Sequence, residues 1–252
     1  MEAFCRLDLR KLDSPPDVGA RITAACRTAR LVVARTHPAV GRHREFWDEA
    51  LAEQCERVPV DEDVKTGLAT GNLWSDVEFN PEFPQRFRHS SSAQPLHTDG
   101  AYLYDPPPIV FMVCHRAAPR GGATLFLDGQ RLLSVLATER PELLTMLTGA
   151  IVRFNKAGVH VESTIIATPP DGPFLRWNYY TMRNQVSPDL LAIVENFHCF
   201  LQDTVDRSLP LAVRLNEGDA VFFHDARVLH GRDSFTAGIT GDRCLWKGGL
   251  RI

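Results

Sequence analysis

From about residue 69 to the C-terminus, the sequence is made of short apolar runs that glycine and proline clusters separate from one another. The runs are too short for typical helices, but their length and their bounding turn residues suit β-strands. They lie at residues 109–114, 124–127, 174–178, 211–215 and 220–223. This pattern predicts a mostly β architecture with flanking helices and favours a jelly-roll barrel with the helices on its outside.

Helical periodicity appears in four segments. Near the N-terminus, a cap residue at Asp13 or Ser14 is followed by two prolines, and the apolar residues beyond them recur at helical spacing. Gly149 is expected to end a later helix, and Ser187 is expected to cap another. We expect helices over about 16–34, 43–57, 130–147 and 188–205.

The length and the composition fit one folded unit. A chain of 252 residues with 44% hydrophobic content can bury one sizeable core, and β-sandwiches and barrels of this size are commonly single domains. We therefore expect a single domain over residues 1–252, with N-terminal helices in about 16–57 packed on the barrel.

The charges give no reason to expect a polyanionic partner. The chain has 28 basic and 31 acidic residues and a formal net charge of -3, so electrostatic capture of nucleic acid is not expected. The expected partner is a small-molecule substrate, and the sequence leaves the oligomeric state open.

The spacing of the cysteines and the hydropathy of the chain indicate where in the cell the protein is expected. The six cysteines are scattered without a CxxC pair or zinc-ligand spacing, as expected for reduced thiols. Residues 1–14 lack the apolar core of a signal peptide, and the apolar runs fall far short of the roughly 20 residues that span a bilayer. We expect a cytoplasmic protein that is neither exported nor inserted in a membrane.

The tripeptide His97-Thr98-Asp99 is the first candidate for metal chemistry. In extended backbone, residues i and i+2 point to the same side, so one ion can contact both the imidazole and the carboxylate. A distant histidine would complete a facial triad of two histidines and one carboxylate. Such a triad leaves coordination positions open and is typical of non-haem iron(II) oxygenases.

Two histidines near the C-terminus, His224 and His230, compete for the third position. His230 stands thirteen residues before Arg243, whereas Ala237 stands thirteen residues after His224. A carboxylate co-substrate beside the metal needs a cationic clamp, and the planar guanidinium of arginine binds a carboxylate through two parallel hydrogen bonds. The spacing therefore favours His230 and leaves His224 as a polar residue at a strand end.

Four ordered blocks resemble the taurine dioxygenase and gamma-butyrobetaine hydroxylase family of iron(II)- and 2-oxoglutarate-dependent oxygenases. The blocks are HTDGAY from His97, GGATLFLDG from Gly121, NEGDAVFFHDARVLHGRDSF from Asn216 and GDRCLW from Gly241. The resemblance runs from about Arg88 to the C-terminus, roughly two thirds of the chain.

The resemblance implies a double-stranded β-helix (jelly-roll, cupin-like) that holds iron(II), with 2-oxoglutarate and dioxygen as co-substrates. It also implies that Arg243, helped by Thr124, binds the distal carboxylate of 2-oxoglutarate. Arg232 and Arg251 compete for this role. Arg232 is expected in a structural ion pair, and Arg251 lies beside a terminus that can fray.

The implied reaction decarboxylates 2-oxoglutarate oxidatively to succinate and carbon dioxide. It hydroxylates an unactivated C–H bond of a small molecule such as an amino acid or a natural-product intermediate. Asp99 is present where related halogenases lack a carboxylate, which favours hydroxylation over halogenation. The same ligands permit desaturation, cyclisation or epimerisation. More distant alternatives are a non-catalytic metal-binding jelly-roll module and a metal hydrolase or isomerase.

Substrate specificity is not carried over from this family. The first 90 residues hold no counterpart of the zinc domain of gamma-butyrobetaine hydroxylase. Arg176 is a candidate for binding a substrate carboxylate, and strand alternation would place Asn178 on its face and Trp177 and Tyr179 in the core. His160 lies in a segment that could cover the site. The candidates for substrate binding are Asn72, Trp74, Gln94, Tyr102, Arg176, Asn178 and Tyr180.

Overall fold

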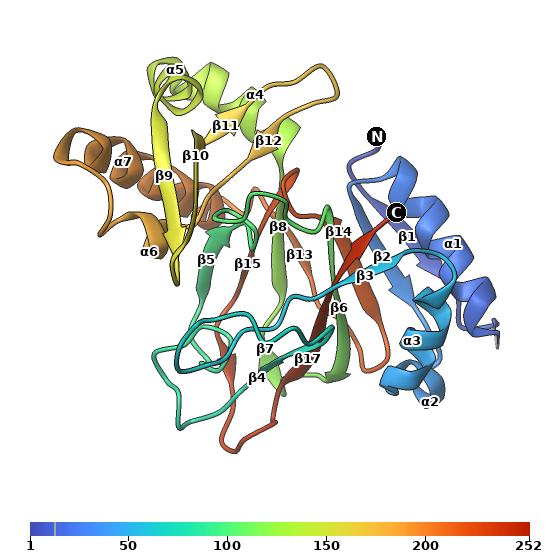
Figure 1. The fold of residues 1–252 in the computed structure, drawn as a ribbon. Coiled ribbons are helices and arrows are strands. Elements are labelled where there is room, and N and C mark those ends of the chain that lie inside the picture. The colour runs from blue at the N-terminus through green and yellow to red at the C-terminus, as the bar shows by residue number, and fades with distance from the viewer. Residues whose placement is uncertain (13) are drawn as a thin grey trace.

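Two β-sheets form the centre of the protein in the computed structural model, which describes residues 1–12 and 14–252 (Figure 1). The larger sheet has the strand order β1 (Cys5–Asp8), β2 (Leu31–Arg35), β14 (Ala220–His224), β6 (Ile109–Arg116), β17 (Cys244–Arg251) and β3 (Glu56–Val58), and β4 (Ser75–Glu78) also pairs with β17. The smaller sheet has the order β13 (Leu211–Val213), β8 (Thr124–Asp128), β15 (Val228–Arg232) and β5 (Gln94–His97). Three two-stranded sheets pair β9 (Ile151–Lys156) with β10 (Val159–Thr164), β11 (Ile166–Ala167) with β12 (Phe174–Leu175), and β7 (Arg120–Gly121) with β16 (Phe235–Thr236). The predicted mostly β architecture is confirmed.

Strand β6 shows that the larger sheet is covered on both faces. Its residues from Ile109 to Cys114 are all buried. Phe111 packs in the core beneath the N-terminal helices, whereas Val110 and Met112 pack in the core that lies between the two sheets. Because successive side chains of a strand point to opposite faces, a continuous apolar run marks a strand that is buried on both sides.

The two faces of the smaller sheet have different surroundings. Leu127 and Leu229 pack in an outer core with the later helices. Thr124, His230 and Arg232 alternate with these residues along β8 and β15, and they line a cavity on the opposite face. Side chains that pack in the outer core therefore alternate along the two strands with side chains that line the cavity.

The N-terminal helices cover one face of the larger sheet: α1 (Pro15–Thr28), α2 (Pro38–Gly41) and α3 (Arg44–Ala52). The Ser14 side chain caps α1, and Asp13 lies outside the described residues. The helix predicted over 16–34 is wrong at its end, because Leu31–Arg35 forms the fully embedded strand β2. Its two adjacent valines favour a strand over a helix. The helix predicted over 43–57 likewise ends early, before β3.

The later helices lie with hairpin β9–β10 beside the smaller sheet (Figure 1): α4 (Gly129–Glu139), α5 (Pro141–Gly149), α6 (Tyr179–Met182) and α7 (Pro188–Asp206). The helix predicted over 188–205 is confirmed. The helix predicted over 130–147 is two helices, because Pro141 starts a new one and its ring disfavours helical backbone at Arg140. The strand predicted over 174–178 ends at Leu175, and Asn178 instead caps α6. Among the described residues, no helix has both the length and the apolar character that crossing a membrane requires.

Candidate active site

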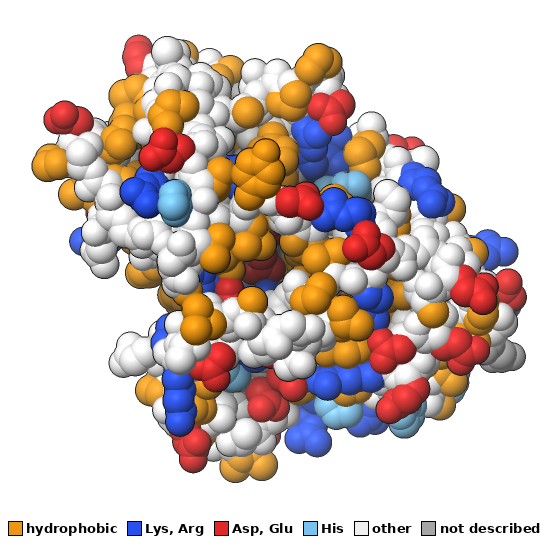
Figure 2. Space-filling model, in the orientation of Figure 1, with side chains coloured by type: hydrophobic (Ala, Val, Ile, Leu, Met, Phe, Trp, Pro, Cys, Tyr) orange, Lys and Arg blue, Asp and Glu red, His pale blue; other side chains and the backbone are white. Residues whose placement is uncertain are grey.

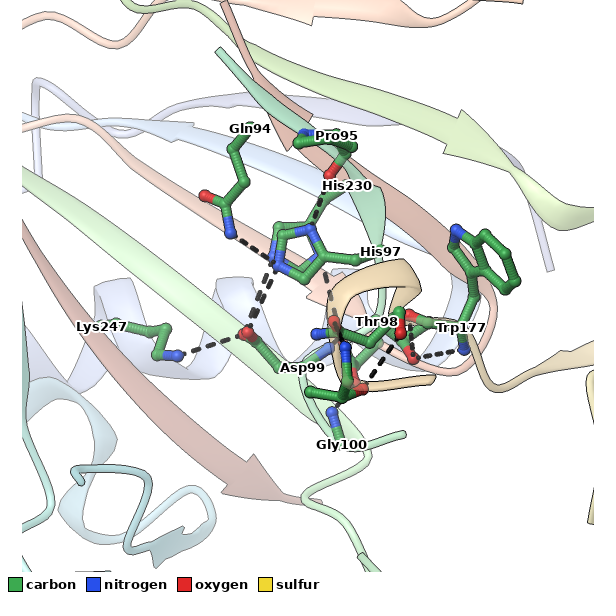
Figure 3. Close-up of polar contacts among 12 residues, drawn as sticks. Gln94, Pro95, His97, Thr98, Asp99, Gly100, Trp177, His230 and Lys247 are labelled. Carbon is green, nitrogen blue, oxygen red and sulfur yellow. Dashed lines mark hydrogen bonds and ion pairs between the residues drawn. The ribbon is translucent and has the colours of Figure 1, made fainter. Parts of the chain in front are cut away.

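The residues His97, Asp99 and His230 meet at one point. His97 ends β5, Asp99 follows it, and His230 lies opposite His97 in the register of β5 and β15. The His97 Nε2 atom is 3.7 Å from Asp99 Oδ1, and the His230 Nε2 atom is 3.7 Å from Asp99 Oδ2. One possible ligand atom from each residue lies within 4.8 Å of the other two. Figure 3 shows both rings facing the carboxylate, so one ion can contact all three side chains.

The electrostatics of these side chains fit a metal ion. Burial lowers the pKa of His230 to about 3, so its ring is neutral at physiological pH. Burial also acts to raise the pKa of Asp99, but the neighbouring Lys247 ammonium holds it well below its usual value. A neutral imidazole and an ionised carboxylate are the forms that bind metal ions.

The orientation of His97 is fixed by its second ring nitrogen. His97 Nδ1 donates a hydrogen bond to the Pro95 carbonyl oxygen at 2.9 Å, which leaves the lone pair on Nε2. Gln94 Nε2 donates to that lone pair at 3.1 Å. Gln94 therefore occupies the place that an ion would take on His97.

A cavity of about 790 Å³ adjoins the triad and is lined by His97, Asp99, His230, Thr124 and Arg243. Figure 2 shows a recess on one face of the molecule, between the part that holds hairpin β9–β10 and the later helices and the loops of residues 56–93. The triad and the two predicted co-substrate residues thus share one solvent-connected space that is large enough for two small molecules.

Arg243 is a buried cation. Its side chain makes no hydrogen bond or ion pair with the rest of the described chain, and burial lowers its pKa to about 10, so it stays charged. Gly122 adopts a φ of 72°, and a Cβ atom there would lie 3.3 Å from Arg243 Nε. An isolated buried charge is costly unless a ligand of opposite charge pairs with it. The surroundings of Arg243 therefore fit an anion such as a carboxylate.

The competing residues are engaged elsewhere. The Arg232 guanidinium donates to the carbonyl oxygens of Phe87, Ser90 and Ser92, at 3.0, 2.9 and 2.7 Å. These contacts are structural, although the predicted ion pair is wrong because the acceptors are backbone carbonyls.

Two further competitors lie away from the triad. Arg251 pairs with Glu56 and Asp105 and does not line the cavity. The His224 Nε2 atom lies 2.8 Å from the Cys26 carbonyl oxygen of α1, on the helical side of the larger sheet.

Four of the predicted substrate residues line the cavity: Gln94, Tyr102, Asn178 and Tyr180. The other three do not. Asn72 is exposed and donates to Asp61. Trp74 donates its Nε1 hydrogen to Asp48 and packs against aromatic side chains of the N-terminal core.

Arg176 is turned away from the cavity. Its Nη1 group donates to the carbonyl oxygens of Ala101 and Leu103, at 3.0 and 2.7 Å, and its side chain is buried. The predicted strand alternation fails here because the chain leaves β12 before Arg176. Trp177 and Tyr179 lie in the core as predicted. His160 is exposed on hairpin β9–β10.

Sequence reasoning missed the cation Lys247. Its Nζ atom is 3.3 Å from Asp99 Oδ2, and it lines the cavity. Arg243 directly precedes β17, and Lys247 lies within the strand, four residues later. Alternation along that strand would have placed both side chains on the same face.

Sequence reasoning also missed a polar network farther along the cavity wall. Tyr102 donates its hydroxyl hydrogen to Glu62, and Lys156 of β9 pairs with the same carboxylate. The Lys156 Nζ atom also lies 4.8 Å from the centroid of the Tyr102 ring. These three residues come from distant segments, so no local spacing reveals them.

Solved oxygenase structures share this fold. An asparagine oxygenase in complex with Fe(II), 3-hydroxyasparagine and succinate superposes with a TM-score of 0.66 at 16% identity, covering 93% of this chain and 78% of that one. The non-haem iron oxygenase OrfP in complex with Fe and alpha-ketoglutaric acid gives 0.65 at 19% identity, covering 94% and 80%. At such identities the likeness concerns the fold.

Sequence comparisons place the chain in a family. It is 28% identical over 162 residues to the gamma-butyrobetaine dioxygenase of Homo sapiens, which covers 60% of this chain and 42% of that protein. It is 29% identical over 181 residues to dioxygenase str8 of Strobilurus tenacellus, covering 69% and 42%. The chain thus matches less than half the length of these relatives. The model of the Taurine catabolism dioxygenase TauD, TfdA family matches residues 12–247. The chain belongs to this family of 2-oxoglutarate-dependent, non-haem iron dioxygenases.

Proposed function

We propose that the protein couples the decarboxylation of 2-oxoglutarate to the hydroxylation of an unactivated C–H bond in a small molecule, such as an amino acid or a natural-product intermediate. The proposal is carried by one cavity that holds both a facial triad and a buried cation, Arg243, which has no partner in the part of the chain that the structure describes. We assign His97, Asp99 and His230 as iron ligands and Thr124 and Arg243 as the site of the distal carboxylate of 2-oxoglutarate.

The bound iron would supply the activation of dioxygen. The protein residues would provide orientation and exclusion of water. Arg243 and Thr124 lie on the inward side of the cavity, where two hydrogen bonds from the guanidinium can fix one carboxylate. Fixing that end determines where the 2-oxo acid end meets the triad.

The ligand set favours hydroxylation over halogenation. Asp99 supplies the carboxylate that related halogenases lack, so the place where those enzymes bind a halide is already filled. Desaturation, cyclisation and epimerisation use the same ligands and are the alternatives for the reacting carbon. A purely metal-binding role gives no reason for a buried, unpaired Arg243 in the same cavity.

The Lys247 charge in the cavity supports a substrate with an acidic group. Once Asp99 binds the metal, the Lys247 ammonium has no other acceptor among its described contacts. Farther along the wall, the Glu62 carboxylate already pairs with Lys156 and accepts from Tyr102, so a basic substrate group would have to compete with these contacts. The names of the similar proteins mention gamma-butyrobetaine and hydroxyasparagine, both of which carry groups of opposite charge.

The proposal is tested with a panel of free amino acids, their N-acetylated and amidated forms, and neutral compounds. Purified protein with iron(II) and 2-oxoglutarate is expected to release succinate faster with an amino acid, and mass spectrometry is expected to find one added oxygen atom. The His97→Ala variant is the negative control. Stimulation by neutral compounds alone would contradict the proposed substrate class, and stimulation without oxygen insertion would favour the other reactions.

We also propose that the seven-stranded and four-stranded sheets are the two halves of a double-stranded β-helix and that residues 1–252 form one domain. Side chains of β6 and β14 share a core with those of β8 and β15, which supports this arrangement. A cytoplasmic location stays a prediction, and all six cysteines being free is compatible with it.

A further inference from the structure

Asp225 lies in the turn between β14 and β15, and its carboxylate faces the segment that carries the metal motif. Its Oδ1 atom accepts a hydrogen bond from the backbone N–H of Asp99 at 2.9 Å. Its Oδ2 atom accepts one from the backbone N–H of Gly100 at 2.8 Å. The side chain is buried, with 2% of the residue exposed. Both oxygens therefore hold the backbone at Asp99, the residue that supplies the carboxylate ligand, and at Gly100.

The same carboxylate also faces the other strand of the site. The His230 Nδ1 atom lies 3.8 Å from Asp225 Oδ1. This nitrogen is buried and has no hydrogen-bond partner among the described residues. His97 differs, because its Nδ1 atom already donates to the Pro95 carbonyl oxygen. Asp225 Oδ1 thus lies just beyond hydrogen-bond distance of an N–H group on His230.

We propose that Asp225 is a positioning residue that fixes both the Asp99 backbone and the tautomer of His230 for metal binding. With the hydrogen on Nδ1 directed at Asp225, the lone pair of His230 Nε2 faces the metal position. Carboxylates that accept the second N–H of a ligating histidine orient its ring and increase its basicity. One side chain would in this way couple the two segments that supply the ligands.

The proposal rests on the proposed ligand assignment, and it distinguishes Asp225 from an ordinary buried carboxylate. Asp219, at the other end of β14, provides the matched comparison. It is also buried, and its Oδ2 atom accepts the backbone N–H of Asn216 at 3.1 Å. Asp219 does not line the cavity. Replacing either aspartate by asparagine removes one acceptor from a buried turn, but only Asp225 faces His230.

The experiment is an anaerobic titration of the metal-free wild type, Asp225→Asn and Asp219→Asn with iron(II) in competition with a chelator. Thermal unfolding of each metal-free protein is measured alongside. An asparagine amide keeps only one acceptor oxygen, so in either orientation its NH2 group faces a backbone N–H that Asp225 accepted, and Asp225→Asn is expected to weaken iron binding about 10- to 100-fold. Asp219→Asn is expected to bind iron like the wild type.

Wild-type iron affinity in Asp225→Asn, or an equal loss in Asp219→Asn, would overturn the proposal. If Asp225→Asn does not fold, Asp225→Glu replaces it, and unchanged iron affinity in that variant contradicts the proposal equally. The competition assay needs no turnover. A failure of the proposed function appears instead as a wild type that binds iron normally but hydroxylates nothing in the panel.

Discussion

At the scale of single residues, the site is organised around charges that have no permanent partner. Among the described residues, Arg243 is buried without an acceptor, and Lys247 has only Asp99, which the metal would engage. These cations are costly in the free protein and become favourable only when anionic ligands enter the cavity. Arg243 is assigned to 2-oxoglutarate, whereas Lys247 contacts the metal ligand Asp99. The two residues therefore lead to separate predictions.

Replacing Arg243 by lysine keeps the charge but removes the planar pair of donors. A hydrogen bond to a charged group contributes about 1.5–3 kcal/mol, so the KM for 2-oxoglutarate should rise roughly ten- to hundredfold. Succinate release measured against 2-oxoglutarate concentration checks this. Arg251→Lys is the control, since Arg251 lies outside the cavity. An Arg243→Lys enzyme with the wild-type KM would show that the clamp lies elsewhere.

Replacing Lys247 by methionine keeps the length of the side chain and removes its charge. The Lys247 ion pair competes with a metal for Asp99, so iron(II) should bind at least as tightly as in the wild type. Stimulation of succinate release by amino acids should fall about tenfold, because a charge-assisted hydrogen bond is lost. Iron binding weakened together with activity would instead indicate that Lys247 supports the metal site.

At the scale of the elements, short polar segments hold the metal motif in place. The segment after β12 contacts the motif through Thr98, whose backbone N–H donates to the Trp177 carbonyl oxygen at 2.7 Å (Figure 3). Arg176 from the same segment holds the loop that follows Gly100. The position of Asp99 thus depends on a neighbouring loop as well as on its own strand.

The Arg176→Met variant tests this structural role. Loss of the guanidinium leaves carbonyl oxygens of residues 101 and 103 without their donor, which should cost about 2–4 kcal/mol of unfolding free energy. Urea unfolding of the metal-free protein measures this loss. Unchanged stability with a selective loss of activity toward carboxylate substrates would restore the substrate role first suggested by the sequence.

Element boundaries that depend on local residues were predicted well. Elements whose conformation depends on pairing with distant strands were not. Ser187 and Pro188 start α7 where expected, since a helix start depends on local residues. The run Leu31–Arg35 continued a helical pattern but became a strand, because β1 and β14 pair with both of its edges. Arg176 likewise could not be placed, because its acceptors lie more than seventy residues away.

At the scale of the whole molecule, two sheets bring together residues that are far apart in the chain. His97 and His230 are cross-strand neighbours although 133 positions separate them. The compact motif and the spacing from His230 to Arg243 were enough to predict that the three side chains meet and that Arg243 shares their cavity. Asp225, Glu62 and Lys156 were not predictable, because their roles depend on contacts between segments that share no local pattern.

We propose that iron(II) and 2-oxoglutarate bind together through the triad and Arg243. The most direct test is the visible absorption spectrum of the protein with both components under anaerobic conditions. The wild type should show the weak charge-transfer band of a chelated complex, and the His97→Ala variant should lose it. Absence of the band in the wild type, or its persistence in His97→Ala, would show that iron and 2-oxoglutarate do not bind in this way.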